Sequence, residues 1–332
     1  MLVLGVETSC DDTAAAVLLS GRKVLANLVS SQDRIHGPYG GVVPELASRQ
    51  HIRHVLPIVD AALERAGVAL QDLDGIAVTR GPGLVGSLLV GLSVVKGISF
   101  RWGIPYVGVN HLEAHLVAIF LEREVPFPYI ALLASGGHTL LCLVKGFGDY
   151  LYLGGTKDDA AGEAYDKVAK MMGMGYPGGR VIDEMARSGN PKAIRFPRSR
   201  MKRGRYDFSF SGLKTAVWHY LKTYGDGQPG ITKADVAASF QEAVVDMLIA
   251  PTLRAARDLG VGRIVLAGGV AANSRLRGRL GNKAEEEGIE THFPAPAFCT
   301  DNAAMIALCG HYWLTQGRRD DYRLNADADL TL

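Results

Sequence analysis

The chain contains 332 residues, of which 48% are hydrophobic and 21% are charged, and its formal net charge is +2. This length accommodates two domains with full cores, and the composition is that of a soluble globular protein. No run of about 18 uninterrupted apolar residues occurs in the sequence, so we expect no transmembrane span and no membrane partner.

The start of the chain and its cysteines indicate a cellular compartment. Met1–Val6 runs directly into a strand-like segment without a charged leader region or a cleavage site, so we expect no secretory signal. The four cysteines show no paired short spacing, which disfavours a disulfide framework or a Cys-based zinc ribbon. These are Cys10, Cys142, Cys299 and Cys309. We therefore expect a protein of the reducing cytoplasm.

In the first part of the chain, short apolar runs alternate with stretches of helical periodicity. The expected strands are Leu2–Val6, Ala14–Leu19, Lys23–Ser31, Ile76–Thr79 and Tyr106–Val109, and the expected helices lie within Gly40–Ala66 and Leu84–Trp102. Two or three of the first strands should be antiparallel neighbours. The alternation of strands with helices favours an α/β fold with a central sheet.

The pattern then restarts, which suggests two related lobes with a boundary near residues 122–128. The expected strands are Tyr129–Ala134, Thr139–Lys145 and Arg263–Ala267, and the expected helices are Glu163–Met172, Val181–Arg187, Ser211–Lys222, Lys233–Leu259, Ser274–Lys283 and Ala303–Thr315. The strand, glycine turn and strand that open the second half resemble the strand, polar turn and strand of Leu2–Leu19. Thr300 is a candidate cap for the last helix.

Two histidines at helical spacing are a candidate metal site. His111 and His115 stand four residues apart, so both imidazoles lie on one helix face and can bind a divalent transition metal. The alternative is a helix with two unrelated histidines. A zinc protease is disfavoured because Glu113 lies about 200° around the helix from either histidine and cannot act as the general base there.

Asp11 and Asp12 form a second candidate site, on the polar turn after the first strand. Carboxylates at such a turn can hold a cation or orient a phosphate or a nucleophile. Since aspartate is a favoured turn residue, simple turn chemistry is the alternative.

Two later segments suggest anionic ligands. The strand Arg263–Ala267 ends in a Gly-Gly turn followed by a helix, an arrangement whose free amides can bind a phosphate or nucleotide. Residues 195–205 carry six basic side chains and no acid, so they can neutralise nucleic-acid phosphates. A solvated loop is the alternative for this basic run.

Seven motifs, in this order, resemble those of the tRNA threonylcarbamoyladenosine transferase family, of the bacterial TsaD type, which was formerly called O-sialoglycoprotein endopeptidase. The resemblance spans nearly the whole chain. Asp12 departs from it, since most members should have glutamate there. The motifs are Glu7–Asp11, Asn110–His115, Ser135–His138, Asp158–Lys167, Tyr176–Gly179, Gly268–Asn273 and Cys299–Asn302.

The resemblance implies an α/β fold of the actin-like, sugar-kinase-like (ASKHA) class, with two lobes of related βαβ topology and the active site in the cleft between them. Residues 1–125 would form the N-terminal lobe with the two-histidine helix. Residues 126–332 would form the C-terminal lobe with the adenylate-binding glycine turns and a third metal ligand.

The implied activity is transfer of the threonylcarbamoyl group from threonylcarbamoyl-AMP to the exocyclic amine of the adenosine 3′-adjacent to the anticodon, in tRNAs reading codons that begin with A, with release of AMP. By motif, the metal ligands would be His111, His115 and Asp301. The adenylate would be bound by Ala134, Ser135, Gly136, Gly137, His138, Asp166, Gly179, Asp183 and Asn273. Asp11 is our candidate to orient the adenine amine or to accept its proton.

The resemblance also implies one divalent ion per chain, iron(II) in first place and zinc(II) as the alternative. The implied partners are tRNA, a paralogous pseudo-enzyme of the TsaB type and a small ATPase of the TsaE type, while a separate enzyme makes the adenylate. Two other functions compete. A sugar- or acetate-kinase-like phosphotransferase of the same fold needs no two-histidine metal site. A non-catalytic partner paralogue should lack the metal ligands.

Overall fold

The computed structural model describes residues 1–199, 204–225 and 228–332, which form two compact units. Unit 1 comprises Met1–Val125 and Thr300–Leu332, and unit 2 comprises Pro126–Cys299. The sequence predicted that residues 126–332 belong to one C-terminal lobe. The structure differs, because the last 33 residues, 300–332, return to unit 1.

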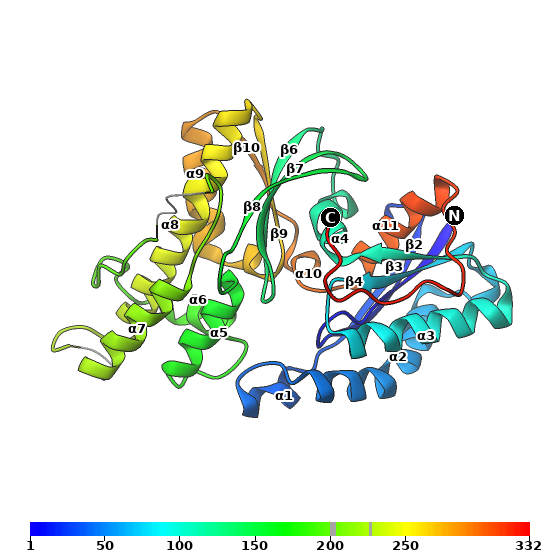
Figure 1. The fold of residues 1–332 in the computed structure, drawn as a ribbon, viewed down its shortest axis with the longest axis horizontal. Helices are drawn as coiled ribbons and strands as arrows, with labels where there is room; N and C mark the ends of the chain where they lie inside the picture. Colours follow the sequence, from blue (N-terminus) through cyan, green and yellow to red (C-terminus); the bar gives the residue numbers. More distant parts are fainter. Residues whose placement is uncertain (200–203, 226–227) are drawn as a thin grey trace. The chain divides into compact units, whose positions relative to one another are not determined.

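Unit 1 is built on a five-stranded mixed sheet with the strand order β3-β2-β1-β4-β5 (Figure 1). The strands are β1 (Leu2–Glu7), β2 (Thr13–Leu19), β3 (Lys23–Ser30), β4 (Gly75–Gly81) and β5 (Tyr106–Asn110). The first three pair antiparallel, the larger of the two predicted numbers, whereas β4 pairs parallel with both β1 and β5. The carboxyl ends of β1, β4 and β5 therefore lie at one edge of the sheet.

Alternating residues of β1 face different helices, as the two-residue period of a strand requires. Leu4 and Val6 pack in one core with residues of α2 (Pro44–Ala66) and α3 (Val85–Trp102). Gly5 faces α11 (Ala303–Thr315), where a Cβ would meet the carbonyl oxygen of Ala303 at 2.2 Å. This close approach places α11 on the first sheet and explains the revised division of the chain.

Unit 2 repeats the topology of unit 1, which confirms the internal repeat. Its sheet has the order β10-β9-β6-β7-β8, in which the first three strands of the unit again pair antiparallel and β9 adds parallel to β6. The strands are β6 (Tyr129–Ala134), β7 (Thr139–Gly146), β8 (Asp149–Gly155), β9 (Arg263–Ala267) and β10 (Glu290–His292). The sequence did not predict β8, which is largely exposed, or β10, which has only three residues.

The helices of unit 2 closely follow the predicted ranges. They are α5 (Ala161–Met171), α6 (Gly178–Ala186), α7 (Ser211–Tyr224), α8 (Lys233–Leu259) and α9 (Ser274–Glu286). The buried residues Phe240, Val244 and Leu248 recur every four positions on α8, which packs on β6 and β9. Short elements that were not predicted are α1 (Asp33–His36), α10 (Pro296–Cys299) and the 3-10 turns Gly37–Tyr39, Leu70–Asp72, Ala118–Leu121 and Gly269–Ala272.

By length and composition alone, α3 and α8 could each cross a membrane. Core helices of globular proteins meet the same criterion. The apolar stretch of α8 is 78% buried inside the structure and that of α3 is 33% buried, and α3 contributes Leu92 and Val95 to the core of unit 1. Both helices therefore act here as packing elements.

The close packing of α11 predicts a stability effect at Gly310. A Cβ at this position would lie 2.1 Å from the Cβ of Ala77, so Gly310→Ala must push α11 away from β4. We expect a loss of about 1–3 kcal/mol in the free energy of unfolding, measured by urea denaturation. Gly97→Ala is the matched control, because a Cβ at Gly97, in the exposed part of α3, would meet no atom within 4 Å. An unchanged midpoint for Gly310→Ala would show that α11 is not packed as described.

Candidate metal centre and nucleotide site

The two-histidine helix is α4 (His111–Val117), which follows β5 directly. Asn110 caps it, because its Oδ1 accepts hydrogen bonds from the backbone N–H groups of Leu112 (2.8 Å) and Glu113 (3.2 Å). His111 is therefore the first helical residue and His115 lies one turn later. Both are buried, and their ring centroids are 4.7 Å apart. The predicted placement of both imidazoles on one helix face is confirmed.

Asp301 reaches the same place from the segment before α11. Its Oδ1 lies 3.1 Å from His115 Nε2 and 3.5 Å from His111 Nε2. One ligand atom from each of the three residues lies within 4.8 Å of the others. Asn302 rather than Thr300 caps α11, since its Oδ1 accepts from the Met305 N–H at 3.1 Å, so the predicted Thr300 cap is wrong. The candidate metal site lies wholly within unit 1.

The carboxylate of Glu7 contacts the imidazole of His111 at Nδ1, the ring nitrogen that does not face Asp301. Its Oε2 lies 3.0 Å from His111 Nδ1 and accepts a hydrogen bond of 2.7 Å from Thr79 Oγ1, while its Oε1 accepts from the Ser9 N–H. A carboxylate on Nδ1 fixes the ring so that Nε2 faces Asp301, an arrangement typical of histidine metal ligands. This role of Glu7 was not predicted from the sequence. A carboxylate at the end of a fully buried apolar strand was the available signal.

The cluster electrostatically favours a positive charge at its centre. Burial alone would lower the pKa of His111, but the carboxylates of Glu7 and Asp301 raise it to about 10. Burial would raise the pKa of Asp301, but His111 and His115 hold it well below its usual range. Two imidazole nitrogens and one carboxylate oxygen are also ligands that suit zinc or iron. The residues therefore fit a divalent metal ion.

Glu113 takes no part in this cluster. Its Oε2 accepts a hydrogen bond of 3.2 Å from Trp313 Nε1 on α11. It is not one of the three residues that converge, as its angular position on the helix predicts. Glu113 therefore cannot supply the general base of a zinc protease.

The turn that carries Asp11 and Asp12 is fixed by a buried histidine of α2. Burial lowers the pKa of His51, so its ring is neutral; Nε2 donates to the Cys10 carbonyl (2.9 Å) and Nδ1 accepts from Thr13 Oγ1 (2.8 Å). Burial also raises the pKa of Asp11, and burial together with the Asp11 and Asp301 carboxylates raises that of Asp12 to about 8. Both carboxyl groups are half-buried and lie in unit 1 with the metal cluster.

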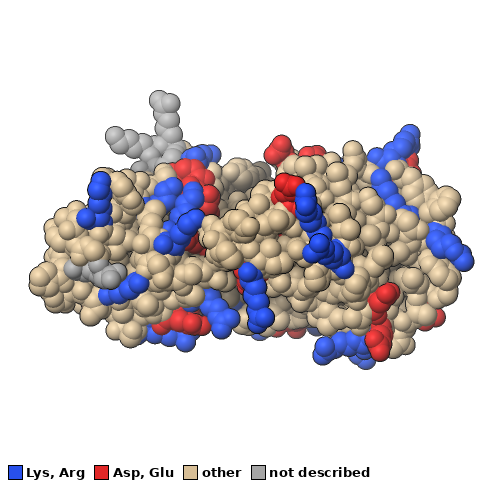
Figure 2. Space-filling view, turned by 90° about the horizontal axis from the view of Figure 1, so that it is seen from below, with Lys and Arg blue, Asp and Glu red and all other residues tan. Residues whose placement is uncertain are grey.

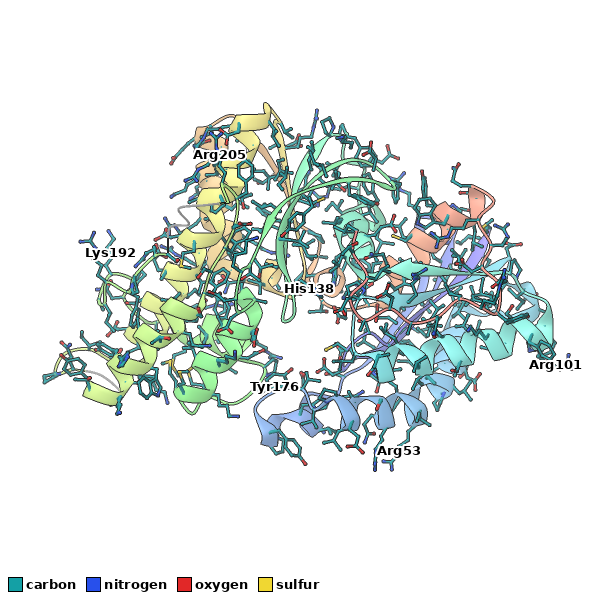
Figure 3. The ribbon with its side chains drawn as sticks, viewed as in Figure 1. Arg53, Arg101, His138, Tyr176, Lys192 and Arg205 are labelled. Atoms are coloured by element: carbon teal, nitrogen blue, oxygen red, sulfur yellow. The ribbon has the colours of Figure 1, made fainter. Side chains whose placement is uncertain are left out.

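The predicted adenylate residues lie in unit 2, where glycines allow the backbone segments to meet. Ser135–His138 forms the turn between β6 and β7, closed by the Ser135 N–H donating to the His138 carbonyl at 2.7 Å. A Cβ at Gly162, at the start of α5, would lie 2.6 Å from the Ser135 carbonyl oxygen. A Cβ at Gly268 would lie 2.4 Å from the carbonyl oxygen of Ala134. Gly136 and Gly137 face open space, and Figure 3 labels His138 on this turn.

The start of α6 adds the next predicted residues. The Gly178 N–H donates to Asp166 Oδ1 at 2.7 Å, and a Cβ at Gly179 would meet no atom within 4 Å. Asp183, one turn later on α6, accepts a 2.9 Å hydrogen bond from Ser274 Oγ at the start of α9. The loop before α6 carries Tyr176, which Figure 3 labels.

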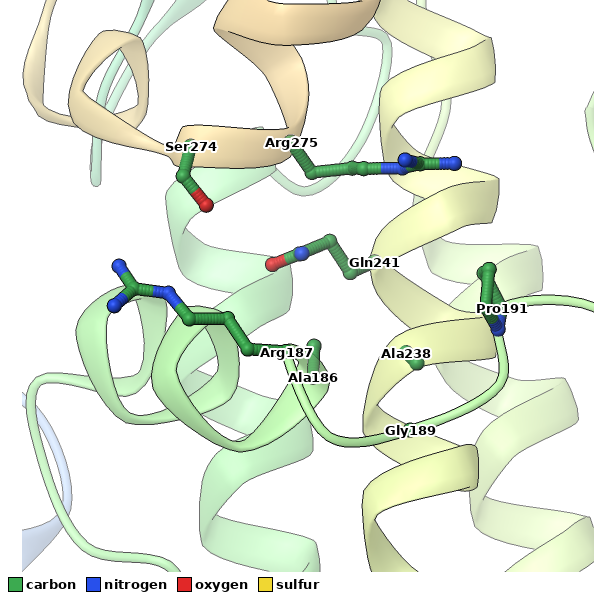
Figure 4. A pocket seen from close by; sticks show the side chains of 8 residues that line it. All are labelled: Ala186, Arg187, Gly189, Pro191, Ala238, Gln241, Ser274 and Arg275. Carbon is green, nitrogen blue, oxygen red and sulfur yellow. The ribbon is translucent and has the colours of Figure 1, made fainter.

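Asn273 caps α9 and contacts a residue that was not predicted from the sequence. Its Oδ1 accepts from the Leu276 N–H at 2.9 Å, and its Nδ2 lies 2.9 Å from Oε1 of Gln241 on α8. Gln241 lines a pocket of about 340 Å³, which is in the range of small-molecule sites (Figure 4). The other residues that line it are Ala186, Arg187, Gly189, Pro191, Ala238, Ser274 and Arg275.

The basic run is only partly described, because residues 200–203 lie outside the described residues. Arg198 Nε lies 3.1 Å from an Asp246 oxygen, and an Arg205 nitrogen lies 2.9 Å from Asp258. Arg195 is exposed. On the face shown in Figure 2, Lys and Arg side chains are spread among other residues and do not form one continuous patch.

Comparison with known proteins identifies the family. The sequence model of the family described as TsaD, tRNA N6-adenosine threonylcarbamoyltransferase, matches residues 23–308. A protein of that name from Syntrophotalea carbinolica is 54% identical over 332 residues, which are 100% of this chain and 97% of the relative. Another of the same name, from Anaeromyxobacter dehalogenans (strain 2CP-C), is 56% identical over 327 residues, 98% of each chain.

Solved structures show the fold. Component A of (R)-2-hydroxyglutaryl-CoA dehydratase from Acidaminococcus fermentans is 18% identical, with a TM-score of 0.56 over 95% of this chain and 99% of its own. Full-length HypF in a phosphate- and nucleotide-bound form is 13% identical, with a TM-score of 0.62 over 94% of this chain and 55% of its own. The α/β fold is thus of the predicted ASKHA class.

The family match covers most of the chain, and the identity to full-length relatives exceeds one half. The chain therefore belongs to the TsaD family and is an enzyme, a tRNA N6-adenosine threonylcarbamoyltransferase.

Proposed function

We propose that the enzyme transfers the threonylcarbamoyl group from threonylcarbamoyl-AMP to the exocyclic amine of the adenosine 3′-adjacent to the anticodon, in tRNAs reading codons that begin with A. AMP is the leaving group. The convergence of His111, His115 and Asp301 in a chain of this family is the observation that carries the proposal. A kinase-like phosphotransferase of the same fold has no need for such a cluster.

The chemistry of this substrate requires no protein nucleophile. A mixed carbamic–phosphoric anhydride is already activated, so the adenine amine can attack the carbamoyl carbon. A C–N bond forms, the C–O bond to phosphate breaks, and its electron pair leaves with AMP. The amine must lose one proton. A divalent ion bound by the three ligands would act as a Lewis acid toward a substrate oxygen.

Unit 2 offers groups suited to the nucleotide. Gly136, Gly137 and Gly179 have open space where a side chain would be, so the backbone can approach a phosphate closely. Gly179 lies in the first turn of α6, whose N-terminal amides favour an anion. Asp183 and Asn273 lie beside the pocket of about 340 Å³, because each contacts a residue that lines it.

Asp11 is the proposed group that orients the amine or accepts its proton. Burial moves its pKa upward, toward the range in which a general base works well at neutral pH. Asp12, whose pKa is raised to about 8, holds its proton at pH 7 and is a poorer acceptor. His51 acts indirectly by fixing the turn.

We further propose one divalent ion per chain, iron(II) with zinc(II) as the alternative, because neutral imidazoles and a carboxylate suit both. The proposed partners are tRNA, a TsaB-type paralogue and a TsaE-type small ATPase, in the cytoplasm. The direct test supplies threonylcarbamoyl-AMP and unmodified tRNA to the purified enzyme with these partners. Mass spectrometry should detect the threonylcarbamoylated nucleoside and AMP in equal amounts. Phosphate transfer from ATP to a small molecule, without modified nucleoside, would favour the phosphotransferase.

The metal ligands lead to a prediction about metal content. His111→Ala should remove most of the bound metal, measured by elemental analysis, and most of the transfer activity. Glu7→Gln should lower metal affinity by roughly 10–100-fold, because it weakens the group that orients His111. His54→Ala is the matched control, since His54 contacts Ser30 rather than the cluster. Unchanged metal content in His111→Ala would overturn the ligand assignment.

The role of Asp11 predicts a defect confined to transfer. Asp11→Asn should retain metal and adenylate binding but slow single-turnover transfer by roughly 10²–10⁴-fold, the scale of general-base catalysis. Asp60→Asn, at an exposed position of α2, is the control. Near wild-type transfer would reduce Asp11 to a turn residue, for which Asn serves equally well. Loss of metal along with activity would instead make Asp11 part of the metal site.

The basic run predicts a change in the salt dependence of tRNA binding. Replacing Arg195, Arg200, Lys202 and Arg203 with Ser should reduce the slope of log affinity against log salt by roughly 0.7–0.9 for each tRNA phosphate that is no longer neutralised. The control makes the same charge change at exposed positions of unit 1, namely Lys23, Arg53, Arg65 and Arg123. Equal slopes for the wild type and the basic-run variant would show that residues 195–205 form only a solvated loop.

A further inference from the structure

Gln241 projects from α8 into the pocket of unit 2. Gln241 is 5% exposed. Figure 4 shows its side chain extending from α8 toward the start of α9, where Ser274 lies. The side-chain amide of glutamine offers one acceptor oxygen and two N–H donors, so its two ends require different partners. The partners of each end therefore indicate what the pocket is built to bind.

The orientation of the Gln241 amide follows from a chain of hydrogen bonds. The Leu276 backbone N–H can only donate, so the Asn273 atom that it contacts must be the carbonyl oxygen Oδ1. The other end of Asn273, Nδ2, then donates to Gln241, whose contacting atom must be the acceptor Oε1. Nε2 of Gln241 is thereby left with two N–H donors. Within the described residues, no group accepts a hydrogen bond from it.

The lining of the pocket favours an uncharged ring over an anion. Both arginines at its rim are paired: Arg275 contacts both Glu242 carboxylate oxygens (2.7 and 3.2 Å), and Arg187 lies 3.4 Å from Asp183. They offer little uncompensated positive charge to a phosphate. Four further lining residues are small or apolar, namely Ala186, Gly189, Pro191 and Ala238. Such a surface suits the face of a heterocycle.

We propose that Gln241 is a specificity-determining residue that reads the nucleobase of the adenylate, by donating a hydrogen bond from Nε2 to a ring nitrogen of adenine. The inference rests on the proposed function, because it takes the nucleotide of the substrate as the occupant of the pocket. Adenine presents acceptor nitrogens N1, N3 and N7 on its edges, and the donor of Gln241 selects bases with an acceptor at the contacted position. Asn273 acts through Gln241 as a positioning residue.

Gln241→Glu separates base reading from a structural role. The carboxylate still accepts the hydrogen bond from Asn273, so the cap of α9 is kept, but it has no donor for a base. Gln241→Met removes both the acceptor for Asn273 and the donor for a base. Gln316→Glu is the matched control, with the same charge change at an exposed position of unit 1. Thermal unfolding and metal content verify that each variant is folded.

The measurement is calorimetric binding of adenosine, AMP and the 1-, 3- and 7-deaza analogues of adenosine. Adenosine carries no phosphate, so charge repulsion of the phosphate by the new carboxylate cannot mimic the effect. We expect Gln241→Glu to bind adenosine about tenfold more weakly than the wild type, the scale of one hydrogen bond. One deaza analogue should bind the wild type about as weakly as adenosine binds Gln241→Glu. The affinity of that analogue should not fall further in the variant.

Two results would overturn the assignment. Wild-type affinity of Gln241→Glu for adenosine would remove Gln241 from base recognition while leaving the proposed adenylate substrate intact. Failure of the wild-type enzyme to bind either adenosine or AMP would overturn the adenylate itself and this inference with it. If Gln241→Glu does not fold, the deaza series on the wild type still decides, since equal affinity for all three analogues and adenosine contradicts a ring-nitrogen contact.

Discussion

The contact between Glu7 and His111 is the constraint on which unit 1 depends. Both side chains are buried, and a carboxylate without compensation in such a place would cost several kcal/mol. Thr79, Ser9 and His111 supply that compensation from separate segments. Three strands must therefore align at their carboxyl ends before the charges are satisfied. Open α/β sheets place their ligand sites at this edge.

Asp301 completes the cluster only because α11 packs closely on the first sheet. Its backbone approaches β1 at Gly5 and β4 at Gly310, where no larger side chain fits. Asn302 then caps the helix and leaves the preceding Asp301 directed at both histidines. Residues nearly two hundred positions apart in sequence thus form one site inside one unit. The metal cluster does not depend on the placement of the other unit.

The features that the sequence predicted correctly are those that depend on the local spacing of side chains. The i, i+4 spacing of His111 and His115 and the strands of β1, β6 and β9 follow from side-chain spacing alone, and the structure confirms them. The predicted assignment of residues 300–332 to the C-terminal lobe was wrong, because the small residues that allow their packing on unit 1 leave no periodic signal. The exposed strand β8 lacks a buried apolar run, so hydrophobicity could not reveal it.

Long-range polar contacts were the least predictable part of the sites. Glu7 lies 104 positions before His111, and Gln241 lies 32 positions before Asn273. No spacing rule joins either pair. Asp301, Asp183 and Asn273 were named only through the resemblance to the TsaD family. The structure adds their partners, and with them a physical reason for the orientation of each side chain.

We propose that His111, His115 and Asp301 bind one divalent ion and that Glu7 orients the imidazole of His111 toward it. Anomalous X-ray diffraction from crystals of the purified enzyme, recorded at the iron and zinc edges, tests it most directly. We predict one strong peak in unit 1, about 2.0–2.2 Å from both Nε2 atoms and an Asp301 oxygen, with the Nδ1 of His111 on Glu7. A peak bound by Glu113, or no peak at these three residues in active enzyme, would contradict the claim.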